Sequence, residues 1–150
     1  HRLEQYRASA FAQEGANVAI NYRSGPDEAE ATRVQVNEAC MAARAGDCRD
    51  LIVQADVSRE DQVKEMFAAV VESFGSIDVL VNNAGIQKLG PSHEVELKDF
   101  DSVVGVNLRG AFLCAREAIR HFLARGGGGV ILNNSSVHEV IPKPKYLPYS

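Results

Sequence analysis

The chain has 150 residues, of which 45% are hydrophobic and 24% are charged, and its formal net charge is −4. This length predicts one domain that can bury a core, and the acidic balance argues against a nucleic-acid partner, whose binding surface would be basic. No apolar run approaches the length of a membrane span, and the start, His1–Tyr6, has no apolar stretch typical of a secretory signal.

Apolar residues recur along the chain with the three- and four-residue steps of helices. Gly15 and Gly75 each end such a pattern, because glycine readily takes the left-handed conformation found at helix ends. Ser58 has a side chain that suits a helix N-terminus. The predicted helices cover residues 3–14, about 27–44, 58–74 and 97–124.

Short β-branched runs separate these helices, and their nearly continuous apolar character is typical of strands buried on both faces of a parallel sheet. The alternation of helix and strand predicts an α/β fold, a doubly wound parallel sheet with helices on both faces, in a single domain over residues 1–150. The predicted strands are Val18–Tyr22, Leu51–Ala55, Ile77–Val81 and Val130–Asn133.

Polar or glycine residues follow each predicted strand directly. In an open α/β sheet, ligands bind beyond the carboxyl ends of the strands. Four ends equipped in this way therefore predict a groove for a cofactor. The four segments are Arg23-Ser24-Gly25, Asp56-Val57, Asn82-Asn83-Ala84-Gly85 and Asn134-Ser135-Ser136.

Each of these segments also has an interpretation without a ligand. Ala84 and Gly85 would let the backbone approach a flat ligand, or they belong to a tight turn stabilised by asparagine side chains. Asp56 suits a helix cap as well as a ligand contact. Arg23 suits a ribose 2′-phosphate, to which arginine donates in bidentate fashion, or it is an ordinary solvated loop charge.

Asn107 lies between Gly105 and Gly110 within the longest predicted helix. Glycine and asparagine are poor formers of a helix interior, and such a local conflict often marks a kink or a functional position. The alternative is a surface asparagine beside glycines that allow close helix packing.

These elements together resemble the short-chain dehydrogenase/reductase family, from about Arg7 to Ser150. The resemblance rests on Asn82–Gly85, Asp56-Val57, Asn107, and the twelve residues between Ser136 and Tyr149. It implies a Rossmann-like fold and hydride transfer between a nicotinamide cofactor and an alcohol or carbonyl. The segments Ser135–Pro142 and Asn21–Ser24 are most similar to the glucose 1-dehydrogenase branch, which implies a sugar as one candidate substrate.

The resemblance also implies roles for individual residues. Ser136 would hold the substrate oxygen, Tyr149 would act as general acid and base, and Asn107 would order a water in the proton relay. An NAD site usually has a carboxylate just after this strand to bind the ribose, but here the first acidic residue after Tyr22 is Asp27. The sequence therefore favours NADP as the cofactor, with NAD tolerated. The implied cofactor-binding residues are Arg23, Ser24, Asp56, Val57, Asn83, Ala84 and Gly85.

Two parts of the family pattern are expected to lie outside this sequence. The family has a first strand and a glycine-rich turn, and no such run precedes Arg7; it also has a lysine four residues after the tyrosine, at position 153. In the strand order 3-2-1-4-5 the first strand is central, so its absence would leave two separate strand pairs. We therefore expect the chain alone to be marginally stable and to bind NADPH weakly. The alternative function is a non-catalytic, truncated remnant with at most a role in subunit interaction, because in this family the helix equivalent to residues 97–124 packs between subunits.

The three cysteines are Cys40, Cys48 and Cys114, and they have neither a C-x-x-C nor a zinc spacing. Their odd number, without a signal peptide, favours reduced thiols and a cytoplasmic location. Cys114 falls in a helical apolar pattern and is expected in the core. The four histidines have no metal-ligand grouping, so no metal is expected. His93-Glu94 and His138-Glu139 fall in loops expected to overhang the substrate. The resemblance to the sugar-oxidising branch implies that they touch the substrate, and exposed loop charges explain them equally well.

Overall fold

The computed structural model describes residues 2–150, and its elements follow the predicted order of helices and strands. Eleven elements are described in this part of the chain, the last of them a 3₁₀ helix. They are α1 (Arg2–Gln13), β1 (Val18–Tyr22), α2 (Pro26–Ala43), β2 (Asp50–Gln54), α3 (Glu60–Phe74), β3 (Val79–Asn82), α4 (Leu97–Val104), a π-helical segment (Gly105–Gly110), α5 (Ala111–Ala124), β4 (Val130–Asn133) and the 3₁₀ helix Val137–Glu139.

Small shifts at the element ends have local causes. The backbone N–H of Ile77 donates to His121 Nε2 at 3.1 Å, so this residue is held by a side chain and β3 begins at Val79. Helix α3 begins at Glu60 and not at Ser58, because the first helical bond runs from Val63 N–H to the Arg59 carbonyl at 3.0 Å. The predicted stops at Gly15 and Gly75 are confirmed, with φ of 84° and 85°.

The single helix predicted over residues 97–124 is wrong in one respect, because the π-helical segment Gly105–Gly110 interrupts it. A β-carbon on Gly110 would lie 2.7 Å from Val57 Cγ2 and 3.2 Å from the Val57 carbonyl oxygen. Only glycine allows the helix to approach this neighbour so closely. The local conflict around Asn107 therefore marks a real irregularity of the helix.

The chain forms two compact units, which are described separately. Unit 1 comprises His1–Asp56 and Lys64–Ser76, and unit 2 comprises Val57–Val63 and Ile77–Ser150. That the two belong to one domain stays a prediction from the sequence.

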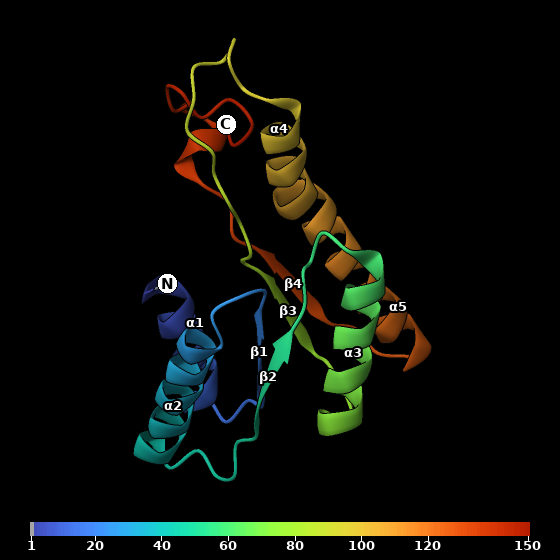
Figure 1. Ribbon diagram of the computed structural model, residues 1–150. Coiled ribbons are helices and arrows are strands. Elements are labelled where there is room, and N and C mark those ends of the chain that lie inside the picture. Colours follow the sequence, from blue (N-terminus) through green and yellow to red (C-terminus); the bar gives the residue numbers. More distant parts are fainter. Residues whose placement is uncertain (1) are drawn as a thin grey trace. The chain divides into compact units, whose positions relative to one another are not determined.

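Unit 1 contains the parallel pair β1 and β2, in register from Val18↔Asp50 to Tyr22↔Gln54. Helices α1 and α2 pack side by side and against β1, while α2 also contacts β2 (Figure 1). The core of this unit is small. Ala12 and Val36 are completely buried and Cys40 is 5% exposed, and the partly buried residues that pack on them are Ala8, Val18, Ile20, Ala39, Ala45 and Cys48.

Unit 2 contains the parallel pair β3 and β4, in register from Val79↔Val130 to Asn82↔Asn133. Helix α5 packs on both strands. Its buried face consists of Leu113, Cys114, Ala118 and Phe122, which confirms Cys114 as a core residue.

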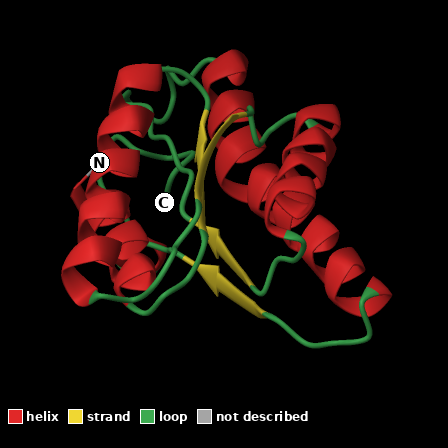
Figure 2. Cartoon of the chain, turned by 90° about the horizontal axis from the view of Figure 1, so that it is seen from below, coloured by secondary structure: helices red, strands yellow, loops and turns green. Residues whose placement is uncertain are grey.

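The two strand pairs are separate sheets of two strands each, and Figure 2 draws their strands in yellow. Within residues 2–150 no strand precedes β1. The prediction that the strands of this chain would fall into two separate pairs is confirmed. No helix in this part of the chain is both long and apolar enough to cross a bilayer.

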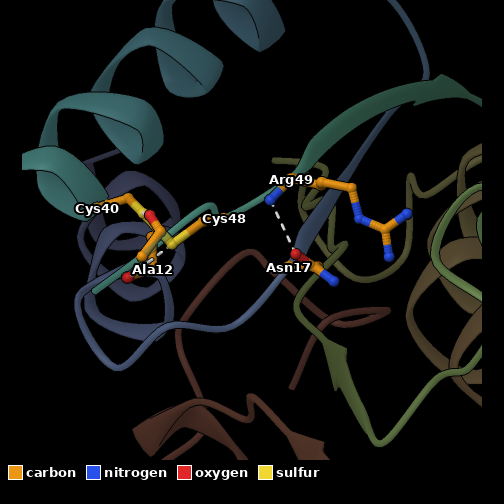
Figure 3. Close-up of a disulfide and its surroundings, with 6 residues drawn as sticks. Ala12, Asn17, Cys40, Cys48 and Arg49 are labelled. Carbon is orange, nitrogen blue, oxygen red and sulfur yellow. Dashed lines mark hydrogen bonds between the residues drawn. A yellow bond between two sulfur atoms is a disulfide. The ribbon is translucent and has the colours of Figure 1, made fainter. Parts of the chain in front are cut away.

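The expectation of three reduced thiols is wrong for two of the cysteines. Cys40 and Cys48 form a disulfide, with their Cα atoms 6.3 Å apart (Figure 3), and Cys114 is the free thiol. The physical reason is a tight turn between α2 and β2, in which Arg44 and Gly46 have φ of 52° and 91°. This turn brings the end of the helix back to the start of the strand.

Candidate active site

The structure distributes the ten predicted site residues over the two units. Unit 1 holds Arg23, Ser24 and Asp56, and unit 2 holds Val57, Asn83, Ala84, Gly85, Asn107, Ser136 and Tyr149.

In unit 2 the carboxyl ends of β3 and β4 are joined by asparagines. Asn134 N–H donates to the Asn82 carbonyl at 2.9 Å, which extends the ladder by one bond. The Asn134 side-chain amide donates to Asn83 Oδ1 at 2.8 Å. One step back, Asn82 Nδ2 donates to Asn133 Oδ1 at 2.9 Å. These bonds hold the segment Asn83–Gly85 beside the segment that leads to Ser136.

Asn107 fixes the backbone just after this segment. Its Oδ1 accepts from Ile86 N–H at 2.8 Å, and its Nδ2 donates to the Ile86 carbonyl at 2.9 Å. The side chain thus satisfies both polar groups of one residue, as a neighbouring strand would. Asn107 Oδ1 lies 3.7 Å from the place a Gly85 β-carbon would take. Ala84 and Gly85 are exposed, so a flat ligand could approach this backbone.

Val57 has a packing role that its place after β2 does not suggest. It is 9% exposed, and its side chain and carbonyl meet Gly110 at the end of the π-helical segment. In the same way Ser58 Cβ lies 3.6 Å from the position of a Gly105 β-carbon. The interpretation of these glycines as helix-packing residues is therefore correct, alongside the role of Asn107 in holding Ile86.

Ser136 stands at the N-terminus of the 3₁₀ helix Val137–Glu139, in an extended conformation. Its Oγ accepts from His138 N–H at 3.2 Å, which leaves its own proton available for donation. The neighbouring Ser135 donates its hydroxyl proton to Glu139. Of these two serines, Ser136 is therefore the one whose hydroxyl can donate to a ligand. Its half-buried hydroxyl could donate to an oxygen of a ligand.

Tyr149 lies in the same loop region as Ser136, and its ring contacts the ring of His138. The His138 and Tyr149 rings meet edge to face, with centroids 6.2 Å apart and planes at 67°. The His138 ring is itself placed by Nδ1, 3.1 Å from the Ile141 carbonyl oxygen. Among the described residues, the Tyr149 hydroxyl has no hydrogen-bond partner. His138 therefore touches both candidate catalytic residues, Ser136 by its backbone and Tyr149 by its ring.

Of the two lysines ahead of Tyr149, Lys143 has its ammonium group in contact with other side chains, and Lys145 joins two loops through its backbone. Lys143 Nζ lies 3.8 Å from the centroid of the Tyr146 ring and 3.4 Å from Gln87 Oε1. The Lys145 carbonyl accepts from Gly90 N–H at 2.9 Å, which joins this loop to the one after β3. The spacing of Tyr146 from Ser136 does not match the twelve residues of the family pattern, and its ring face is in contact with the Lys143 cation.

In unit 1 the ends of β1 and β2 also come together. Ala55 N–H donates to the Tyr22 carbonyl at 2.9 Å, and Gln54 Nε2 donates to the Arg23 carbonyl at 3.1 Å. These bonds place the backbone of Arg23 close to the segment that ends in the half-buried Asp56. Arg23 and Ser24 are exposed, and the Arg23 guanidinium has no ion pair with a described residue.

Helix α2 begins next to Arg23 and Ser24, with Gly25 in the left-handed conformation at φ 81° and Pro26 as its first residue. Asp27 and Glu28 occupy the first turn, where carboxylates are favourable to the helix dipole. A Gly25 β-carbon would lie 3.6 Å from Glu28 Oε2, so this carboxylate stands close to the helix start. An anion bound at Arg23 would be attracted by the arginine and repelled by the Glu28 carboxylate.

The site has members that the sequence analysis left out of its residue set. Asn134 binds Asn83, and His138 contacts Ser136 and Tyr149. The signal for Asn134 was present, since asparagines follow both β3 and β4 at equal positions. His138 was expected in a loop over the substrate, but nothing local in the sequence reveals that its ring meets Tyr149. Across residues 2–150 the structure contains no group of three or more histidine, cysteine or acidic side chains suited to a metal ion.

The chain is similar in sequence and in fold to known proteins. Residues 5–150 match the model of the short chain dehydrogenase family. The chain is 45% identical to 3beta-hydroxysteroid dehydrogenase 1 of Eggerthella lenta, covering 95% of this chain and 52% of that protein. It is 43% identical to glucose 1-dehydrogenase of Gluconobacter oxydans, over 95% of this chain and 51% of the relative.

Solved structures show the same likeness. The crystal structure of levodione reductase superposes with a TM-score of 0.86 and 34% identity, over 97% of this chain and 54% of that chain. The chain thus spans about half the length of the relatives that it matches. Both the α/β fold with parallel strands and the expected likeness to glucose 1-dehydrogenases are confirmed. This chain belongs to the short-chain dehydrogenase family.

Proposed function

We propose that the protein carrying this chain is an NAD(P)-dependent oxidoreductase that interconverts an alcohol and a carbonyl compound, with a sugar as one candidate substrate. One observation carries the proposal: in unit 2, Asn134 binds Asn83 at the end of β3 and leads directly to Ser136. The names of the relatives support it, since they include a hydroxysteroid dehydrogenase, a glucose 1-dehydrogenase and levodione reductase.

The residues of unit 2 fit a nicotinamide ring and a substrate oxygen. Ala84 and Gly85 present exposed backbone without bulky side chains, and Asn107 holds the following residue in place. The bound cofactor would supply or accept the hydride. Ser136 would donate a hydrogen bond to the substrate oxygen, and Tyr149 would deliver or remove its proton. By the family pattern, a lysine one helical turn after Tyr149 would favour the phenolate.

The catalytic assignment is tested with Tyr149→Phe in the full protein, measured as NADP⁺ reduction with glucose and a panel of secondary alcohols. Loss of the phenolic proton donor should lower kcat about 100-fold or more, while NADPH binding changes little. The matched control is Tyr146→Phe, three residues earlier in the same loop, which should keep most of the activity. Equal losses in the two variants would remove Tyr149 from the mechanism.

The cofactor preference is a separate part of the proposal. Arg23 and Ser24 would bind the 2′-phosphate of NADP, with Asp56 near the adenine. Arg23→Ala should weaken NADPH binding about 10- to 100-fold, because a charge-assisted contact is lost. Its effect on NADH binding should be small. Glu28→Gln should act in the opposite direction, since it removes a carboxylate that repels a phosphate.

Calorimetric titration of the full protein with NADPH and NADH separates these effects, with Lys64→Ala on the exposed surface of α3 as a control. If Arg23→Ala weakens both cofactors equally, Arg23 does not choose between them.

We also propose that residues 97–124 pack against a second copy of the chain. Support comes from large apolar side chains that stay exposed along this stretch, with Leu97 72% and Leu123 76% exposed. Leu123→Glu should shift the protein toward the monomer in analytical ultracentrifugation. The exposed apolar residues of the stretch are Leu97, Phe100, Leu108, Phe112, Ile119 and Leu123.

A further inference from the structure

We propose that Cys40 and Cys48 are a redox modification site: two-electron oxidation closes the connection between α2 and β2 and stabilises unit 1, and a dithiol reductant opens it again. The inference is independent of the oxidoreductase function. It concerns residues at the amino-terminal ends of the strands, whereas the predicted site residues follow the carboxyl ends.

The turn between the two cysteines is held by its own backbone bonds. Ala45 N–H donates to the Cys40 carbonyl at 3.3 Å, and Cys48 N–H donates to the Gly46 carbonyl at 3.2 Å. These bonds do not involve the sulfur atoms, so they can persist after reduction. The two thiols would then remain close together, which favours re-formation of the disulfide over reaction with an external thiol.

The two sulfur atoms differ in their surroundings. Cys40 is 5% exposed and belongs to the core with Ala12 and Val36, while Cys48 is only partly buried. In Figure 3 the disulfide lies against Ala12, whose carbonyl oxygen is 3.5 Å from Cys48 Sγ. A reductant would therefore attack at Cys48. The thiolate of Cys40 would leave into an apolar environment, so reduction of the folded chain should be slow.

The position of the bond explains how it could stabilise unit 1. Arg49, next to Cys48, donates from its backbone to Asn17 Oδ1 at 2.8 Å (Figure 3). Its guanidinium donates to the carbonyls of Ser73 at 2.7 Å and Phe74 at 3.2 Å. The disulfide thus anchors the segment where the turn before β1 and the end of α3 are held together. Because the core of this unit is small, a covalent link at this point adds much to it.

The chemistry balances with a disulfide oxidant such as oxidised glutathione. The two thiols lose two protons and two electrons as one S–S bond forms, and oxidised glutathione takes them up to give two reduced molecules. In the reverse direction one thiolate of a dithiol such as dithiothreitol attacks Cys48, forms a mixed disulfide with it and releases Cys40 as a thiolate, which takes up a proton. The second thiolate of dithiothreitol then attacks the mixed disulfide, closes the reagent into a ring and releases Cys48.

The pairing is tested on the full protein after equilibration with oxidised glutathione, by alkylation of free thiols, tryptic digestion and mass spectrometry. Trypsin cleaves after Arg33, Arg44 and Arg49, so Cys40 and Cys48 fall in different peptides. The expected product is a disulfide-linked pair of residues 34–44 and 45–49, which dithiothreitol separates. Alkylated Cys40 and Cys48 after oxidation, with no linked pair, would overturn the proposal.

The effect on stability is tested by thermal unfolding with and without dithiothreitol. Reduction should lower Tm by roughly 5 to 10 °C, the size expected for opening a short loop in a chain of this length. Cys48→Ser should have the reduced Tm under both conditions. The matched control Cys114→Ala, which removes the free thiol, should keep the shift. A Tm that does not change on reduction would contradict the stabilising role even if the linked peptides are found.

Discussion

At the scale of single residues, the site depends on side chains that complete the hydrogen bonding of other segments. Asn107 binds both backbone groups of Ile86, and Asn134 binds Asn83. In each pair the partner lies far away in sequence. A side-chain amide carries a donor and an acceptor, and asparagine can therefore replace a missing strand partner over one residue. This role explains why an asparagine stands within a helix whose interior it does not favour.

Asn107→Ala would leave the N–H and carbonyl of Ile86 without these partners. We expect the free energy of unfolding to fall by about 1–3 kcal/mol, the usual cost of unsatisfied buried polar groups. Urea unfolding followed by circular dichroism measures the change. Asn37→Ala on α2 is a suitable control and should stay within about 0.5 kcal/mol of the parent. If the two variants are equally stable, the bonds to Ile86 contribute nothing measurable.

Cys114 provides a test by pH. Burial raises the pKa of its thiol to about 11 from an ordinary 9.0, and the Glu117 carboxylate adds to the shift. Below pH 9 the thiol is neutral in both states, so its contribution to stability is complete. Above that pH the unfolded chain loses the proton first, and the contribution is lost as pH rises toward about 11.

The free energy of unfolding should therefore fall by roughly 2 kcal/mol more in the parent than in Cys114→Ala between pH 8 and pH 11. Urea unfolding at a series of pH values measures both curves. Lysines and tyrosines titrate equally in the two proteins, so the difference isolates the thiol. Parallel curves would show that Cys114 titrates normally in the folded chain.

At the scale of elements, the π-helical segment between α4 and α5 is the feature that the helical periodicity did not predict. Periodicity reports which face of a helix is apolar, and that face continues from Val103 to Leu113 through the segment. The wider π-helical turn accommodates a neighbouring residue, because Gly110 packs closely against Val57. Sequence alone showed the conflict of two glycines and an asparagine but not its geometry.

Gly110→Ala tests this packing. Its β-carbon would meet Val57, including the Val57 backbone, which cannot easily move aside. We expect a loss of about 1–3 kcal/mol, as for overpacked cores, despite the better helix propensity of alanine. Gly128→Ala is the matched control, because nothing lies within 4 Å of its β-carbon position. The comparison uses thermal unfolding, and a stabilised Gly110→Ala would show that the close contact is relaxed in solution.

At the scale of the whole chain, each unit has only a two-stranded parallel sheet. Such a small sheet is marginal in water, and its edges leave backbone groups unpaired. Apolar side chains of the strands are also exposed, including 51% of Val130 and 44% of Leu132. The sequence expectation of marginal stability for this chain alone follows from the same features.

Hydrogen exchange on the 150-residue chain tests that expectation. Amides that donate between β1 and β2 or between β3 and β4 should be protected only weakly, and the outer edges should exchange without delay. The free energy of unfolding should lie at or below the lower end of the usual range, about 5 kcal/mol. A cooperative melt with strong protection throughout the chain would refute the prediction.

The sequence by itself determined the order of helices and strands, the parallel pairing type and the segments that follow each strand. These depend on apolar periodicity, on glycine at helix ends and on asparagine after strands, which are properties of neighbouring residues. Tertiary structure alone decided the pairing of Cys40 with Cys48, the hold of Asn107 on Ile86 and the approach of Gly110 to Val57. Each of these contacts depends on how the backbone turns between its two members, and residue type does not encode that path locally.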